Sequence, residues 1–169
     1  MTIILYAQPY DISAEGFYFR SSEEYEKLAP TIENQFGDLV EEFELQFIDG
    51  GQLDCELAKA WGINQANFSQ YFDAAEDWDE EDKIRFILAV DECGYDFDPE
   101  NTSPDDFDVD IYRVDSMRDL AIEFVDEGLF GEIPERFQCY LDYDAIARDL
   151  QVEYSEAIIA GERLIYRCG

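Results

Sequence analysis

The chain has 169 residues and a formal net charge of -31, from 42 acidic and 11 basic residues, and it contains no histidine. Apolar residues make up 47% and aromatic residues 15% of the sequence, which excludes a disordered acidic tail and allows a folded core. The charge also excludes nucleic acid and anionic membranes as natural partners and favours basic surfaces. A solvating shell of the kind that halophilic proteins carry is the alternative explanation.

The start of the chain and its cysteines predict a cytoplasmic protein. The first six residues lack the basic region of a signal peptide, and no apolar run approaches the roughly 18 residues that a membrane span needs. The four cysteines lie far apart without a CxxC pair. We therefore expect a soluble, cytoplasmic protein whose cysteines are reduced and buried.

Residues 1–52 predict a small mixed α/β module. Strands are expected at residues 3–7, 16–19 and 42–48, the last because polar and apolar residues alternate along it. Ser21 to Glu24 offers a capping box for a helix that Pro30 interrupts. Gly50 and Gly51 close the module.

Residues 53–103 predict an acidic helical module, because apolar residues recur at helical spacing up to Gly94. The stretch FDAAEDWDEEDKIRF, residues 72–86, holds seven carboxylates between Asp73 and Asp82. It covers the end of one helix and the start of the next, with Asp77 or Asp79 as the cap of the second. A loop follows at residues 96–103.

Residues 104–169 predict a C-terminal α+β module with antiparallel strands. Acidic and apolar residues alternate at residues 106–111, so a strand there would place Asp106, Asp108 and Asp110 on one face. A helix capped at residues 115–116 and a second helix at residues 133–150 follow, and a hairpin closes the chain. The expected fold class is therefore α+β, in three small modules.

Catalysis and metal binding are not indicated. The absence of histidine removes the commonest general base and metal ligand, and no Gly-rich phosphate loop is present. Asp106-x-Asp108-x-Asp110 begins like an EF-hand loop, but Ile111 and Met117 occupy the places of the required Gly and Glu. We expect no enzyme activity, no cofactor and no specific metal site; a carboxylate-rich metal enzyme or calcium module is a third possibility.

The density of carboxylates is compatible with an imitation of nucleic acid. Duplex DNA carries about one charge per 1.7 Å, so 31 charges would cover roughly 53 Å, or about 15 base pairs. Helical acids at i, i+3 and i+4 rise by about 4.5–6 Å and strand acids at i, i+2 stand about 6.7 Å apart, within the range of phosphate separations. The candidate phosphate mimics are Asp73, Glu76, Asp77, Asp79, Glu80, Glu81, Asp82, Asp91, Glu92, Asp96, Asp98, Glu100, Asp105, Asp106, Asp108 and Asp110.

The stretch GEIPERFQCYLDYDAIARDL, residues 131–150, resembles the C-terminal signature of the ArdA antirestriction family, in which a G-x-x-P turn leads into Y-x-D-[YF]-x-A-x-A-R-D-L. The rest of the chain fits more loosely, and its first fifty residues match the family in strand order more than in residues. The resemblance implies an elongated, acidic homodimer of three modules that mimics bent B-form DNA, carried by mobile genetic elements. It also implies binding to the DNA-binding cleft of type I restriction–modification enzymes, chiefly through the specificity and methyltransferase subunits.

The signature residues are expected to act in structure or dimerisation more than in enzyme contact. They are Gly131, Pro134, Tyr140, Asp142, Tyr143, Ala145, Arg148, Asp149 and Leu150. Gly131 and Pro134 are expected to form a turn, and Arg148 an ion pair with Asp142, Asp144 or Asp149. An acidic adaptor for another basic DNA-binding protein, such as a repressor, a nucleoid protein or a CRISPR-type effector, is the alternative function.

Overall fold

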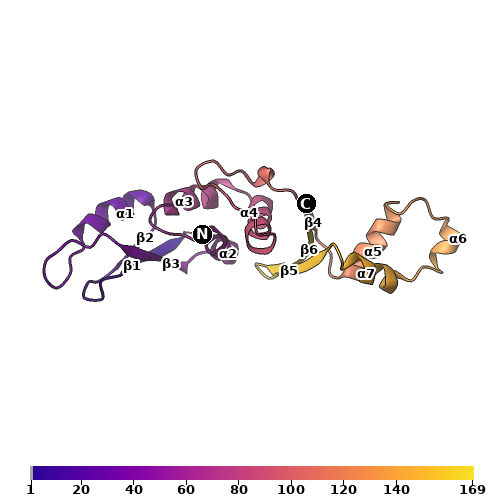
Figure 1. Ribbon diagram of the computed structural model, residues 1–169, viewed down its shortest axis with the longest axis horizontal. Coiled ribbons are helices and arrows are strands. Elements are labelled where there is room, and N and C mark those ends of the chain that lie inside the picture. The colour runs from indigo at the N-terminus through magenta and orange to yellow at the C-terminus, as the bar shows by residue number, and fades with distance from the viewer. Residues whose placement is uncertain (1) are drawn as a thin grey trace. The chain divides into compact units, whose positions relative to one another are not determined.

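The computed structural model describes residues 2–169, and over these residues the fold is α+β, as predicted, with seven α-helices and two three-stranded antiparallel sheets. Figure 1 shows the elements in chain order. The chain divides into two compact units, unit 1 (Met1–Phe107) and unit 2 (Asp108–Gly169). A further division of unit 1 near residue 52 stays a prediction.

The sheet of unit 1 forms where the sequence predicts strands. It consists of β1 (Ile4–Pro9) between β2 (Phe17–Phe19) and β3 (Phe43–Asp49). The chain enters β2 through Gly16, where a Cβ atom would lie 2.2 Å from the carbonyl oxygen of Ala7. Only glycine therefore allows this close approach of the two strands.

One face of this sheet is covered by helices. Helix α1 (Ser22–Leu28) begins at the cap Ser21, whose hydroxyl accepts a hydrogen bond from the Glu24 amide. A 3-10 turn (Ala29–Thr31) follows α1 at Pro30. The rings of Phe17 and Phe19 pack against Tyr25 of α1, and Phe19 also contacts Phe68 of α3. Figure 1 shows α1 and α3 on the same side of the sheet.

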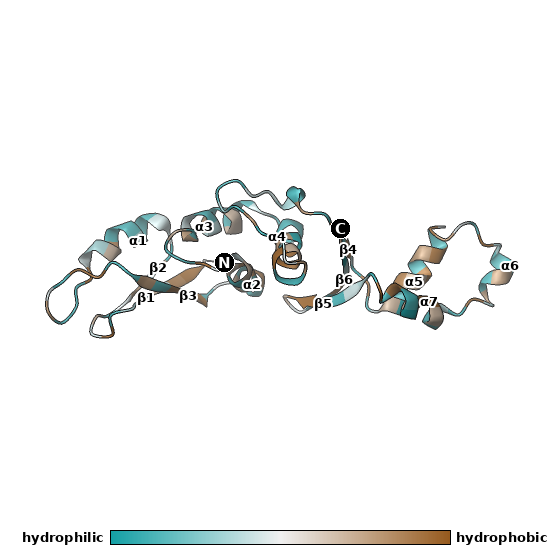
Figure 2. Ribbon diagram, viewed as in Figure 1, coloured by the Kyte–Doolittle hydropathy of each residue, from teal (hydrophilic) through white to brown (hydrophobic). Residues whose placement is uncertain are grey.

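Three helices form in the stretch where the sequence predicts helical structure. They are α2 (Gln52–Trp61), α3 (Phe68–Asp77) and α4 (Glu80–Ile87), and a π-helical turn (Leu88–Glu92) continues α4. Trp61 is 4% exposed and its ring contacts those of Tyr71, Trp78, Phe86 and Phe97. Figure 2 shows the loop that follows α4 and its π-helical turn as largely hydrophilic.

The predicted strand at residues 106–111 is wrong at its beginning. Pro104–Asp106 form a 3-10 turn, and β4 starts at Val109. The Asp106 carboxylate accepts a hydrogen bond from the Ser103 amide at 3.0 Å, which closes the turn. Asp106, Asp108 and Asp110 therefore do not share one strand face.

Unit 2 is built on the second sheet. Strand β6 (Glu162–Cys168) lies between β4 (Val109–Tyr112) and β5 (Ser155–Ile159). The predicted closing hairpin forms from β5 and β6, with its turn at residues 160–161 and not at the expected residues 161–162. Helix α5 (Met117–Asp126) begins at the predicted cap Ser116, whose hydroxyl accepts from the Asp119 amide.

The predicted helix at residues 133–150 is wrong as a single element. It consists of α6 (Glu135–Gln138) and α7 (Tyr143–Leu150). Asp142 has an extended backbone and its carboxylate accepts a hydrogen bond from the Ala145 amide at 3.0 Å. The chain therefore starts a new helix at this cap instead of continuing the first.

The core of unit 2 joins its two longer helices to the sheet. Met117, Leu120 and Phe124 of α5 form a buried cluster with Ala147 of α7, together with Tyr154 and Ile165. The rings of Phe124 and Tyr154 lie 5.6 Å apart and are both in contact with Tyr112. Only Ala147 of α7 is fully buried, so most of this helix stays accessible.

In residues 2–169, no helix is both long enough and apolar enough to span a bilayer.

The expectation of buried, reduced cysteines is wrong for three of the four. Cys55 is a half-buried free thiol, but the free thiol of Cys139 is exposed. Cys93 and Cys168 do not carry free thiols.

Candidate partner-binding surface

Helix α3 presents three of the predicted acids at helical spacing. Its apolar side, Phe68, Tyr71, Ala74 and Ala75, is buried. Its opposite side carries the exposed acids Asp73, Glu76 and Asp77. Because a buried apolar side anchors the helix, these carboxylates are held at the i, i+3 and i+4 spacing of the prediction.

Helix α4 repeats this arrangement at its start. Asp79 caps the helix, as predicted, with its carboxylate accepting from the Asp82 amide at 2.8 Å. Glu80 and Glu81 lie exposed in the first turn, where the helix dipole favours negative charge. The dipole offsets part of the repulsion between these neighbouring acids. One acid of the stretch therefore has a structural role as a cap, Asp82 is half-buried, and the remaining five are exposed on a fixed frame.

The segment after α4 supplies further exposed acids, with different local environments. They are Asp91, Glu92, Asp96, Asp98, Glu100, Asp105 and Asp106. Hydrogen bonds from the Asn101 side chain and the Glu100 amide lower the pKa of Asp98. Partial burial, with Glu92 and Glu56 nearby, raises the pKa of Asp91. Asp98 is therefore held more firmly in its charged form than Asp91.

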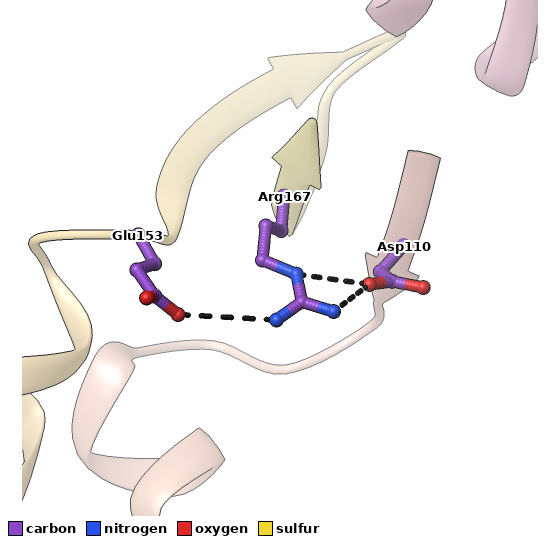
Figure 3. Close-up of polar contacts among 3 residues, drawn as sticks. All are labelled: Asp110, Glu153 and Arg167. Carbon is purple, nitrogen blue, oxygen red and sulfur yellow. Dashed lines mark hydrogen bonds and ion pairs between the residues drawn. The ribbon is translucent and has the colours of Figure 1, made fainter. Parts of the chain in front are cut away.

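The last two predicted acids belong to unit 2, where Asp110 is paired with a cation. The Arg167 guanidinium donates to the Asp110 carboxylate from Nε at 3.0 Å and from Nη2 at 2.7 Å (Figure 3). Its Nη1 lies 3.8 Å from Glu153, and it also lies over the Tyr154 ring. The hydrogen bond to Asp110 is the main cause that raises the pKa of Arg167. Asp110 therefore offers less free charge than Asp108, which is exposed.

Of the sixteen predicted phosphate mimics, fourteen lie in unit 1 and two in unit 2. Fourteen of the sixteen are exposed, and Asp82 and Asp110 are half-buried. Repulsion between exposed like charges opposes folding, so the apolar frame of unit 1 must hold its fourteen acids in place.

The signature segment takes up local structural roles in part. Gly131 has a φ of +96°, as a turn residue would, and Pro134 immediately precedes α6. Tyr140 is 82% exposed, so it contributes nothing to the core of unit 2. Leu150 packs against the buried cluster described above, and Tyr143 lies beneath the Arg118 guanidinium.

The predicted ion pair of Arg148 is wrong. Among residues 2–169, Asp144 pairs instead with Arg118 of α5 at 3.3 Å, and the exposed Arg148 forms no ion pair. Asp142 is the cap of α7, and Asp149 is exposed. Ala145 is half-buried.

Sequence reasoning missed a pocket in unit 1. It has a volume of about 170 Å³, and α3 forms one wall while residues 99–102 contribute to the other. Its lining residues are Trp61, Gln70, Asp73, Ala74, Asp77, Trp78, Pro99, Glu100 and Thr102. Residues 70, 73, 74 and 77 have the i, i+3, i+4, i+7 spacing that places them on one side of a helix, and this spacing could be recognised in the sequence. The opposite wall of the pocket comes from a loop more than twenty residues later, which the spacing does not show.

The acids do not converge on a metal ion. Within the described part of the chain, no three His, Cys, Asp or Glu side chains are grouped closely enough to hold one. Comparison with protein-family models and with curated proteins finds no match for the chain.

Proposed function

We propose that this protein is a non-catalytic DNA mimic that binds the DNA-binding cleft of type I restriction–modification enzymes and inhibits them. The observation that carries the proposal is the row of exposed carboxylates held by α3, α4 and the loop behind them, over a buried aromatic core. The identity of the target rests on the resemblance of residues 131–150 to the ArdA signature. The proposal includes cytoplasmic action, a homodimer formed through unit 2, and carriage on a mobile genetic element.

Physical chemistry explains how such a surface would compete with DNA. A DNA-binding cleft presents Arg and Lys side chains placed to neutralise phosphates, and binding DNA releases condensed counterions. Carboxylates on a rigid frame can satisfy the same cations without the cost of ordering flexible side chains. A net charge of -31 also steers the encounter with a basic cleft.

The test is competition with DNA for a purified type I enzyme. We expect the protein to displace a DNA duplex of the target sequence from the specificity and methyltransferase subunits. A DNA-binding isotherm that is unchanged in excess protein would overturn the proposal. Parallel assays with a purified repressor, nucleoid protein and CRISPR-type effector test the alternative, because a general acidic adaptor would bind one of these instead.

Salt provides a second readout in the same assay. We expect the affinity to fall strongly between 50 and 200 mM salt, because salt screens the attraction between the exposed carboxylates and a basic cleft. A single neutralisation, such as Glu80→Gln, should change the affinity little because the charge is distributed. An affinity that does not depend on salt would contradict binding through phosphate-like charges.

A further inference from the structure

The pocket behind α3 combines aromatic and acidic walls. Trp61 is buried at 4% exposure and its ring centroid lies 5.7 Å from that of Trp78, which is half-buried. Asp73, Asp77 and Glu100 are exposed acids in the lining. No basic side chain lines the pocket.

Gln70 lines the same pocket. Its Oε1 atom is buried without a hydrogen-bond partner, the one such side-chain atom in residues 2–169. Because this atom has almost no accessible surface, a ligand in the pocket cannot donate to it while Gln70 keeps this conformation. The aromatic rings and the carboxylates therefore set the character of the pocket.

The size and chemistry of the pocket narrow the class of ligand. At about 170 Å³ it is smaller than the roughly 300–1,000 Å³ of sites for small molecules, and it suits a single side chain. The carboxylates do not form a group that could hold a metal ion. A ligand must therefore be a larger cation that carries several donors and can lie against an indole ring.

A guanidinium group has these properties. It is planar, presents five N–H donors and stacks on aromatic faces, and tryptophan is the best ring partner for a cation. An ammonium group has three donors and is more strongly hydrated, so it gains less from the same walls. We propose that this pocket receives an arginine side chain of the basic partner, which would add a discrete anchor to the distributed charge.

The inference relies on the proposed function only for the source of the arginine. Its test therefore uses no restriction enzyme. The chain has two tryptophans, and both line the pocket, so their indole N–H resonances report on it. The Trp61 N–H, which donates to the Asn67 carbonyl oxygen at 3.2 Å, does so through changes around its ring. N-acetyl-arginine amide and N-acetyl-lysine amide, which carry the same charge, are titrated at fixed ionic strength while these two resonances are followed by NMR.

We expect the arginine probe to shift both resonances in a saturable manner, with an affinity several-fold above that of the lysine probe. The absence of shifts, or equal shifts with both probes, would overturn the proposal, because diffuse attraction does not distinguish the two cations.

Variants separate the pocket from the general charge. Asp77→Asn combined with Glu100→Gln should weaken binding of the arginine probe about tenfold, because two charged acceptors are lost. The matched control, Glu80→Gln combined with Asp105→Asn, removes the same charge from exposed acids outside the lining. Equal losses for the two double variants would sink the inference.

Gln70→Leu tests the unpartnered oxygen. Since Oε1 accepts no hydrogen bond in the free protein, its removal should not lower the melting temperature. If the protein binds the arginine probe selectively but does not inhibit DNA binding, the pocket proposal is supported and the proposed function is overturned. If it inhibits DNA binding but does not bind the arginine probe selectively, the proposed function is supported and the pocket proposal is overturned.

Discussion

The two units carry acidic residues at similar frequency but use them differently. Unit 1 has 27 carboxylates and five basic residues, a net charge of -22, whereas unit 2 has 15 carboxylates and six arginines, a net charge of -9. In unit 2, Arg113 pairs with Glu162, Arg118 with Asp144, and Arg167 with both Asp110 and Glu153. Several acids of unit 2 therefore pair with arginines of the same unit, between β4 and β6 and between α5 and α7.

In unit 1, by contrast, aromatic packing holds the structure and most acids stay at the surface. The ion pair between Lys83 and Asp54, at 2.8 Å, joins α4 to α2 on the inner side. The fourteen predicted acids of residues 73–106 lie outside this pair, and thirteen of them are exposed. An acidic composition therefore does not by itself identify a binding surface; unit 1 concentrates exposed carboxylates at residues 73–106, whereas several carboxylates of unit 2 pair with its own arginines.

The largest expected effects come from the separate cores of the two units. Phe19→Ala in unit 1 and Leu120→Ala in unit 2 each truncate a fully buried side chain, which should destabilise the respective unit by about 3–5 and 2–5 kcal/mol. Hydrogen exchange should show faster exchange in β1 for the first variant and in β6 for the second. If either variant accelerated exchange equally in both strands, the two units would unfold together and would not have separate cores.

Neutralising matched sets of acids tests the comparison directly. We expect Glu76→Gln, Glu80→Gln, Asp96→Asn and Asp105→Asn together to weaken competition with DNA at least tenfold, since these exposed acids of unit 1 face no cation of the chain in any ion pair of residues 2–169. The control set in unit 2 is Asp119→Asn, Asp126→Asn, Glu127→Gln and Glu135→Gln, all exposed, and should cost less than about threefold. Equal losses would mean that net charge alone matters.

The exposed apolar residues of unit 2 bear on the proposed homodimer. Leu129, Phe130, Phe137 and Tyr140 are each about half exposed or more. Phe137→Glu should convert the dimer to a monomer in light scattering, because a buried charge at an interface is strongly unfavourable. Ile12→Glu in unit 1, where the side chain is 97% exposed, is the control and should leave the dimer intact. A monomeric wild-type protein would contradict dimerisation itself.

The smallest effect is a difference in titration between two acids of unit 1. The pKa of Asp98 is lowered, chiefly by the hydrogen bond from Asn101, and the pKa of Asp91 is raised, chiefly by burial. Asp98 therefore stabilises the fold above its ordinary pKa, and this contribution is lost as the pH falls through its lowered value. Asp91 acts in the opposite sense, since its protonation relieves an unfavourable charge as the pH falls through its raised value. Carbon-detected NMR of the carboxyl groups should find Asp91 titrating at higher pH than Asp98; Asn101→Ala should raise the pKa of Asp98 and leave that of Asp91 unchanged.

The sequence by itself determined most elements and the exposure of the acids. The caps Ser21, Asp79 and Ser116 begin helices where predicted, because a short polar side chain satisfies amides within three residues of itself. Alternation of polar and apolar residues predicted β3, and because α3 and α4 bury their apolar sides, most of their acids are exposed. These signals are local, and local signals can be read from the chain.

Tertiary structure decided what depends on distant residues. Asp110 belongs to the same alternating acidic and apolar pattern as Asp106 and Asp108. In the folded chain, however, Arg167, fifty-seven positions later, donates hydrogen bonds to it across the β4–β6 pair. The pocket exists because residues 99–102 return to α3 and Trp61, which the spacing along α3 alone does not show. Side-chain pairing between separated segments depends on how the whole unit packs, and for that physical reason the paired acids and the pocket could be recognised only in the folded chain.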